Sequence, residues 1–127
     1  YSRHDLLLFP SLHDSGGMVM LEALAHRLPV VCLDIGGPSI IVDKSCGIIV
    51  STSRKSASKV VNDLAASMRL LANDSKLLSS LAANSQQHAM MYRWNNLVID
   101  LYPPSVTEKQ PVRAQDAATE GGDLRYT

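Results

Sequence analysis

Two apolar runs with a helical run between them constrain the fold of this chain more than any other feature. Residues 5–10 (DLLLFP) and 29–35 (PVVCLDI) are almost continuously apolar and bounded by Pro or Gly, as is typical of strands buried on both faces of a parallel sheet. Residues 18–26 predict a helix. This helix should end before Leu28-Pro29, because proline disfavours helix in the residue before it. Strand, crossover helix and strand form a right-handed βαβ unit, so we predict an α/β fold.

The rest of the chain continues with short elements and then with helices. Residues 39–42 predict a short helical turn or a loop, and residues 47–50 (GIIV) predict a short strand. Apolar residues at helical spacing predict an amphipathic helix from Ser56 and a second one capped by Asp74 or Ser75. The apolar positions are Val60, Val61, Leu64, Met68 and Leu71 in the first helix, and Leu77, Leu78, Leu81 and Ala82 in the second, continuing toward Met91.

The C-terminal residues have a different character. Residues 94–102 predict a last short helix before Pro103-Pro104, so the chain would end in two or three helices. Residues 104–127 are mostly polar and have no hydrophobic period, and we expect them to be a disordered tail. Because the chain starts at Tyr1 without Met and enters a strand-like run at once, we also expect it to be a piece of a longer protein.

Composition excludes several classes of protein. Twelve basic residues balance twelve acidic ones, so no net field attracts nucleic acid, and we predict no nucleic-acid partner. No apolar run approaches the roughly 20 residues of a membrane span, and no signal-peptide pattern precedes the first strand, so we expect a cytoplasmic protein. Two cysteines in apolar segments predict buried thiols, and four scattered histidines lack metal-ligand spacing, so we predict no metal.

Residues 13–24 (HDSGGMVMLEAL) carry the candidate chemistry. In a parallel α/β sheet, ligands bind where the strands end and the following helices begin. The amides of Gly17, Met18 and Val19 would lie at such a helix start, where free N–H groups and the helix dipole favour an anion such as phosphate. Gly16 and Gly17 would let a ligand approach the backbone closely.

Two carboxylates flank that turn. Glu22 lies roughly 7 Å along the helix axis from the start of the helix, which suits the distance from phosphate to ribose hydroxyls in a nucleoside diphosphate. Asp14 lies before the turn and would accept from a sugar hydroxyl on the other side of the phosphates. Taken alone, a Glu in a helix is usually a solvated surface residue. The combination of acid, glycine-rich turn and acid within one βαβ unit favours a ligand role.

Residues 5–42 are similar to a known family. They resemble the C-terminal nucleotide-sugar-binding domain of retaining glycosyltransferases with the GT-B fold, the group 1 glycosyl transferases, in which two acids separated by seven residues flank a glycine-rich turn. Asp14 and Glu22 have that separation, residues 47–50 resemble the family's GLLV strand, and residues 92–94 resemble its FSW. The resemblance implies a Rossmann-like parallel sheet with flanking helices, with residues 1–103 as the C-terminal portion of the donor-binding domain.

The resemblance also implies a function. A member transfers a sugar from a nucleotide-diphospho-sugar to an acceptor hydroxyl with retention of configuration, without metal or cofactor, often in polysaccharide biosynthesis. A sugar or lipid-linked acceptor would bind an N-terminal domain that this chain lacks, and peripheral membrane association of the full-length protein is left open. Asp14 and Glu22 would be the catalytic pair. The donor-binding residues would be Ser15, Gly16, Gly17, Met18, Val19, Glu22, Gly36 and Gly37.

Four positions depart from the family pattern. Asp14 replaces a longer Glu, Ser15-Gly16-Gly17 replaces a Gly-aromatic-Gly turn, Arg27 replaces a Gly and would strain the end of the helix, and Ile40 replaces a Glu. The basic side chains that neutralise the phosphates also lie upstream of Tyr1 in the family. We therefore expect the isolated chain to bind donor weakly and to be inactive. Two alternatives stay open: a non-catalytic Rossmann-like binding or interaction module, and, less favoured, a sugar-nucleotide epimerase.

Overall fold

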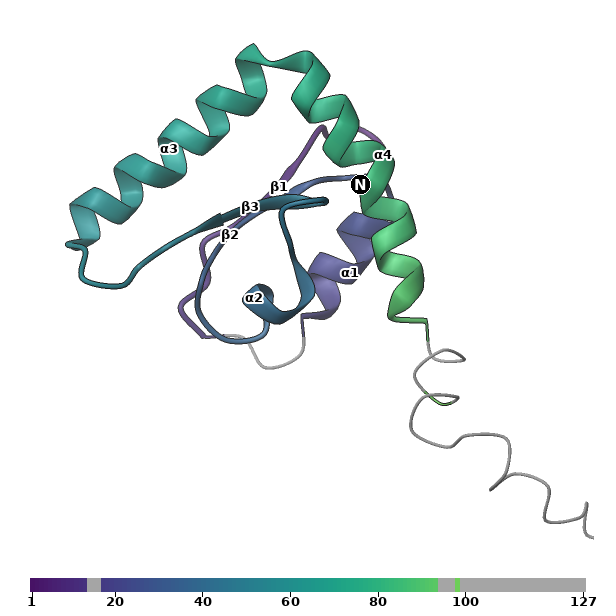
Figure 1. Ribbon diagram of the computed structural model, residues 1–127, viewed down its shortest axis with the longest axis horizontal. Coiled ribbons are helices and arrows are strands. Elements are labelled where there is room, and N and C mark those ends of the chain that lie inside the picture. The colour runs from purple at the N-terminus through teal and green to yellow at the C-terminus, as the bar shows by residue number, and fades with distance from the viewer. Residues whose placement is uncertain (14–16, 94–97, 99–127) are drawn as a thin grey trace, which may run out of the picture.

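The computed structural model describes residues 1–13, 17–93 and 98, and in this part of the chain it has one parallel sheet (Figure 1). Its strands are β1 (Leu7–Phe9), β2 (Val30–Leu33) and β3 (Gly47–Val50), in that spatial order. Strand β2 lies in the centre, with Val30 opposite Leu7 on one side and opposite Gly47 on the other. The three strands predicted from the sequence are therefore confirmed, and they make the predicted α/β architecture.

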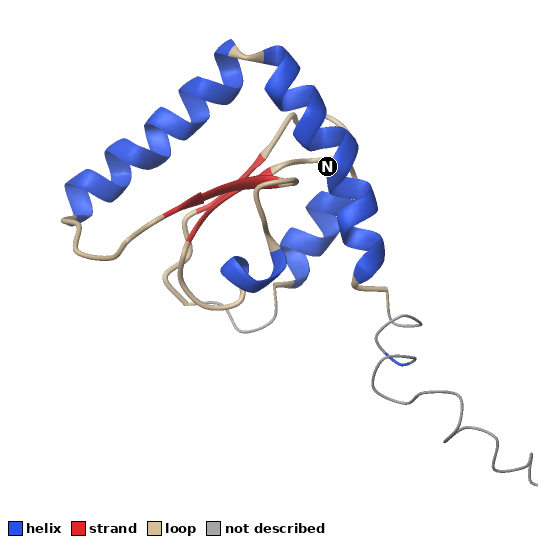
Figure 2. Ribbon diagram, in the orientation of Figure 1, coloured by secondary structure: helices blue, strands red, loops and turns tan. Residues whose placement is uncertain are grey.

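Helices cover both faces of the sheet, as Figure 2 shows. The chain continues from β1 into α1 (Met18–Ala25) and from β2 into α2 (Pro38–Ile41), and both helices pack on the same face. Helix α3 (Ala57–Asn73) lies on the opposite face. Helix α4 (Ser75–Met91) crosses from one face to the other, because Leu77, Leu78 and Leu81 join the cluster under α3, whereas Ala89 packs beside α1.

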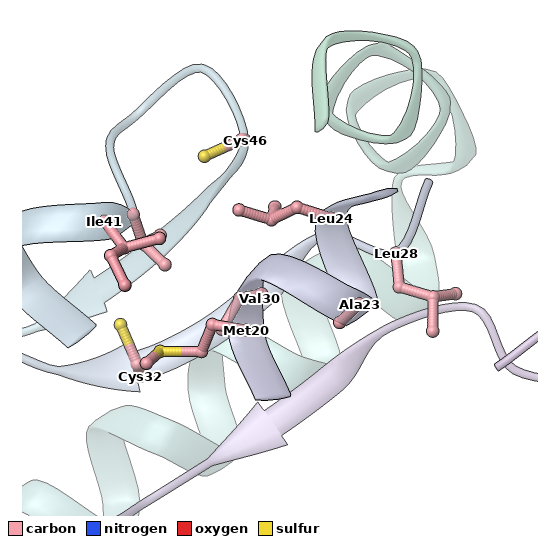
Figure 3. Packing of buried hydrophobic residues seen from close by; sticks show 9 residues of the cluster. Met20, Ala23, Leu24, Leu28, Val30, Cys32, Ile41 and Cys46 are labelled. Atoms are coloured by element: carbon pink, nitrogen blue, oxygen red, sulfur yellow. The ribbon is translucent and has the colours of Figure 1, made fainter. Parts of the chain in front are cut away.

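Two apolar clusters form the core, one on each face of the sheet. The cluster beneath α1 contains Met20, Leu24 and Val30 without measurable exposure, and Figure 3 shows these side chains converging with Ile41 and Cys32 between α1, α2 and the sheet. The second cluster contains Val31, Leu33, Val50, Leu71 and Leu81. Strand β2 is buried along its whole length because it supplies side chains to both clusters.

Local capping explains where the helices begin and end. The side chain of Ser56 accepts from the backbone amide of Lys59 at the start of α3, and the side chain of Asp74 accepts from Leu77 at the start of α4. Such caps satisfy amides that have no partner within the helix. The predicted boundary at Asp74 is confirmed, and it separates two helices that the apolar pattern alone would not divide.

Helix α1 ends in a backbone conformation that usually belongs to glycine. Arg27 has φ 61, its amide donates to Leu24 O at 2.9 Å, and the amide of Leu28 donates to Ala23 O at 2.9 Å. These two bonds make a Schellman motif, in which the left-handed position costs a residue with a β-carbon about 1 kcal/mol or more. The expected strain at Arg27 is confirmed.

Two expectations about burial are wrong. Strand β1 was predicted to be buried on both faces, but it has only one neighbouring strand in the described sheet, and Leu8 is 37% exposed. In α3, Val61 is 62% exposed and Met68 is 37% exposed. Successive residues of a helix point about 100° apart, so Val60 contacts the core whereas Val61 points toward solvent.

Part of the sequence analysis lies outside the described residues. The last predicted helix falls almost entirely on residues 94–97 and 99–102, and the predicted tail covers residues 104–127. The boundary proposed at residue 103 thus stays a prediction. Among the described residues, no helix has both the length and the apolar character that crossing a membrane requires.

Candidate functional site

The candidate site lies at the edge of the sheet where β1 and β2 end. The chain passes from β1 toward the start of α1, and from β2 through Gly36 and Gly37 into α2. The two segments touch: a β-carbon added to Gly17 would overlap the side chain of Ile41 in α2. The fold therefore places Gly17, at the start of α1, against the end of α2.

The start of α1 has the features of an anion-binding helix terminus. Gly17 precedes the helix with φ 59, a left-handed conformation that glycine adopts without strain. Within the part of the chain that is described, the amides of Met18 and Val19 donate no hydrogen bond, and the first turn holds no acidic residue. Met18 is 62% exposed and Val19 42% exposed, and their amides belong to the positive end of the helix.

Glu22 lies on the exposed side of the same helix. Met20, Ala23 and Leu24 are the buried residues of α1, and Glu22 points away from them. Its Oε2 accepts a 2.6 Å hydrogen bond from the hydroxyl of Tyr1. This bond raises the pKa of Tyr1, because ionising a hydroxyl that donates to a carboxylate would lose the bond. The exposed position of Glu22 is compatible with a surface residue and with a residue that contacts a ligand. In the structure its carboxylate accepts from the hydroxyl of Tyr1.

Asp34 organises the loop that contains Gly36 and Gly37. It follows β2 directly, and its carboxylate accepts from the Ser51 hydroxyl at 2.7 Å, the Thr52 hydroxyl at 2.7 Å and the Thr52 amide at 2.8 Å. The bonds from Thr52 and Ser51 lower the pKa of Asp34. Sequence analysis missed this role, although an aspartate after one parallel strand and hydroxyls after the next would have indicated it.

The same loop contains a second left-handed glycine. Gly36 has φ 64, and its carbonyl accepts from the Ser39 hydroxyl at 2.9 Å. Gly36 is exposed and Gly37 partly exposed, so the backbone is open to a ligand at this turn. Six of the predicted donor-binding residues lie on the α1–α2 side of the fold: Gly17, Met18, Val19, Glu22, Gly36 and Gly37. The other predicted site residues, Asp14, Ser15 and Gly16, lie outside the described residues.

Ile40, which departs from the family pattern, belongs to the end of α2 rather than to its start. Its side chain is 76% exposed, and its carbonyl accepts from the Tyr92 hydroxyl at 3.1 Å. The side chain therefore offers no polar group toward the turn. The link between α2 and α4 comes from its backbone instead.

A second group of reactive side chains lies before β3, at the opposite edge of the sheet. Asp43, Cys46 and His88 have ligand atoms that all lie within 4.8 Å of one another. Sequence analysis predicted no metal, because the cysteines lie in apolar segments and the histidines are scattered along the chain without metal-ligand spacing. The packing of α4 across the end of the sheet brings them together.

These features define a class before any family is considered. A parallel sheet with helices on both faces, a glycine-capped helix start after β1 and a glycine turn after β2 is the arrangement of a Rossmann-like α/β domain. Comparison with known proteins then gives the family: residues 1–74 match the family model described as "Glycosyl transferases group 1". This chain belongs to that family, as the resemblance of residues 5–42 predicts.

Individual relatives agree with this assignment. A D-inositol 3-phosphate glycosyltransferase of Salinispora tropica is 33% identical over 123 residues, which cover 94% of this chain and 24% of that protein. The enzyme of the same name from Jonesia denitrificans is 29% identical over 98 residues, or 76% of this chain and 22% of that protein. The chain thus spans about a quarter of the length of these curated relatives.

Solved structures show the same fold. Sucrose-phosphate synthase from Thermosynechococcus elongatus superposes with a TM-score of 0.64 at 21% identity, covering 76% of this chain and 23% of that one. TarM superposes with a TM-score of 0.60 at 20% identity, covering 77% and 19%. The predicted fold class, with a Rossmann-like sheet from a GT-B protein, is therefore confirmed.

Proposed function

We propose that this chain forms part of the donor site of a retaining glycosyltransferase that uses a nucleotide-diphospho-sugar. The observation that carries the proposal is the position of Glu22. Its exposed carboxylate accepts a hydrogen bond from a hydroxyl group. It lies on the helix whose first amides, at Met18 and Val19, donate no hydrogen bond to the described residues. A ribose diphosphate needs a hydroxyl acceptor and an anion-binding terminus at such a separation.

In this proposal each group has a separate task. The amides at the start of α1 bind the diphosphate, and roughly 7 Å farther along the helix Glu22 accepts from the ribose hydroxyls. Gly36 and Gly37 lie beside the nucleotide, and Asp14 with Ser15 and Gly16 contacts the transferred sugar. When the sugar–phosphate bond breaks, negative charge grows on the leaving diphosphate, and fixed amides stabilise it without reorganising. No cofactor or metal takes part in this step of the proposal.

The proposals for the acceptor and for the stereochemistry of transfer are based on the family. The relatives named D-inositol 3-phosphate glycosyltransferase support transfer to the hydroxyl of a polar acceptor. We propose that a protein carrying this chain binds that acceptor through a separate domain and retains the anomeric configuration of the sugar. A non-catalytic module with the same fold is the alternative, and it predicts nucleotide binding without transfer.

The affinity of the isolated chain should be low. A helix terminus contributes about 0.3–2 kcal/mol toward an anion, whereas micromolar binding requires about 8 kcal/mol. Glu22 also places a negative charge near the diphosphate. We therefore expect this chain to bind a nucleoside diphosphate with a dissociation constant well above the low-micromolar range.

Backbone amide NMR tests the placement. Titrating the 127-residue chain with UDP, GDP and ADP should shift the resonances of Met18, Val19 and Gly36, and the isosteric change Glu22→Gln should weaken binding. The change Asp63→Asn serves as the control, because that carboxylate pairs with Lys55 and Lys59 on α3. Shifts confined to other surfaces, or equal effects of the two substitutions, would refute the proposed site.

A further inference from the structure

Asp43, Cys46 and His88 form a compact group outside the proposed donor site. Asp43 and Cys46 belong to the turn between α2 and β3, and His88 comes from the last turn of α4. The turn is well fixed, because the amide of Gly47 donates to Asp43 O at 3.0 Å and the amide of Asp43 donates to Cys46 Sγ at 3.5 Å. Three different ligand types thus come from two separate segments.

The hydrogen bond of His88 determines which ring nitrogen is available. Its Nε2 lies 2.6 Å from Ile41 O, and a carbonyl oxygen only accepts, so Nε2 carries the proton. In the neutral ring Nδ1 then has a lone pair, and it faces Oδ2 of Asp43 at 3.6 Å. Two acceptors that face each other in this way can both bind one cation placed between them.

The separation of these two atoms favours a metal ion over a proton. A charge-assisted hydrogen bond between imidazolium and carboxylate would bring nitrogen and oxygen to about 2.7–2.9 Å. Two ligands of a tetrahedral zinc ion, with bonds of about 2.0–2.2 Å, lie about 3.4 Å apart. The observed 3.6 Å is close to the second value. We propose that Asp43, Cys46 and His88 bind a zinc-like divalent cation.

The third ligand and the surroundings fit this class of ion. Thiolate, imidazole and carboxylate are the ligands that zinc uses in proteins. Burial raises the pKa of the Cys46 thiol; the cation would reverse this preference by forming a metal–sulfur bond as the thiol proton leaves to solvent. The bond from His88 to Ile41 O fixes the ring, which is a common support for a ligating histidine.

A pocket provides access and room for a fourth ligand. It has a volume of about 340 Å³, and Asp43 and His88 line it together with Asn84 and Gln87. Water or a side-chain amide oxygen there would complete four ligands. The side chain of Asp43 is 57% exposed. Its Oδ1 accepts from the amide of Ser45 at 2.8 Å and from the Ser45 hydroxyl at 2.5 Å, which leaves Oδ2 for the ion. Cys46 and His88 are held by the core and by α2.

Titration with Co²⁺ and then with Zn²⁺ tests the site in the whole 127-residue chain under reducing conditions. We expect one Co²⁺ per chain, a thiolate-to-cobalt charge-transfer absorption band, and displacement of that band by Zn²⁺. Cys46→Ala should abolish the band. Cys32→Ala is the matched control, because Cys32 is an equally buried thiol of the same core cluster and is not part of the group.

A surface variant separates metal binding from folding. Asp43→Asn changes an exposed side chain, and it should weaken Zn²⁺ binding by at least the roughly 10- to 100-fold typical of outer-shell changes at metal sites. Zn²⁺ should raise the melting temperature of the wild-type chain and of Cys32→Ala, but should do so less for Asp43→Asn. Absence of the band in the wild-type chain, its persistence in Cys46→Ala, or unchanged Zn²⁺ affinity in Asp43→Asn would overturn the proposal.

Discussion

The hydroxyl of Tyr1 donates a 2.6 Å hydrogen bond to Oε2 of Glu22, the carboxylate that we propose holds the donor ribose. The Tyr1 ring stacks on His26, with ring centroids 5.1 Å apart and planes inclined by 12°. The hydroxyl is therefore held against the outer face of α1. A ribose hydroxyl that approaches this oxygen from the same side would meet the Tyr1 hydroxyl, so Tyr1 competes with the proposed ligand for Oε2.

Replacing Tyr1 should strengthen nucleotide binding. Tyr1→Phe keeps the stacked ring but removes the competing donor, so UDP should bind more tightly to this variant than to the wild-type chain. NMR titration with UDP would measure the change. Tyr92→Phe, which removes the hydroxyl that donates to Ile40 O, is the control. Unchanged or weaker binding by Tyr1→Phe would show that ribose does not use this carboxylate.

Replacing Arg27 should stabilise the fold. Arg27→Gly removes the β-carbon from a residue with φ 61 while the Schellman hydrogen bonds stay in place, and we expect a gain of about 1 kcal/mol in the free energy of unfolding. Urea denaturation measures it. Arg27→Ala keeps the β-carbon and should gain much less. Equal gains in the two variants would assign the effect to the charge of Arg27 rather than to its backbone.

Much of the fold was predictable because it depends on local patterns. The apolar runs around residues 5–10 and 29–35 and the helical run between them specified the βαβ unit, and Asp74 marked the boundary between α3 and α4. The exposure of Leu8 was not predictable in this way, because it depends on how many strands flank β1. The sequence pattern predicts that a strand forms, but it does not predict whether that strand lies at the edge or in the centre of the sheet.

The candidate site was predictable to a different degree. Glycines before a helix and an exposed Glu on that helix follow from short-range spacing, so Gly17 and Glu22 were identified. Three contacts join residues that are far apart in the sequence. They are the hydrogen bond from Tyr1 to Glu22, the bonds from Ser51 and Thr52 to Asp34, and the cluster of His88 with Asp43 and Cys46. They depend on tertiary packing, and spacing along the chain does not reveal them.

Acid should weaken the link that Asp34 makes. Its folded pKa is lowered by the bonds from Thr52 and Ser51, so the stabilisation is complete above the unfolded pKa of about 3.9 and is lost as pH falls through the lower folded value. Asp34→Asn should reduce stability at neutral pH and flatten its decline in acid. Thermal unfolding between neutral pH and strong acid tests this. A decline in Asp34→Asn as steep as in the wild-type chain would contradict the assignment.

A side chain at Gly17 should disturb both stability and the proposed site. Gly17→Ala adds a β-carbon at φ 59 that overlaps Cδ1 of Ile41 and lies 3.2 Å from Cε of Met20, and we expect a loss of about 1–3 kcal/mol in unfolding free energy. Ile41→Val removes the overlapping Cδ1. The cost of Gly17→Ala, measured by urea denaturation, should therefore be smaller in the Ile41→Val background. An unchanged cost would mean that φ strain alone causes it.

The central claim is that Glu22 binds the ribose hydroxyls of a nucleotide donor, and a comparison of UDP with 2′,3′-dideoxy-UDP tests it most directly. NMR titration gives both affinities for the wild-type chain and for Glu22→Ala. The account predicts that the wild-type chain binds UDP more tightly than 2′,3′-dideoxy-UDP. Glu22→Ala should bind the two nucleotides equally, because without the Glu22 carboxylate the ribose hydroxyls have no acceptor to lose. If Glu22→Ala kept the wild-type preference, or if the wild-type chain bound the two nucleotides equally, the assignment of Glu22 would be wrong.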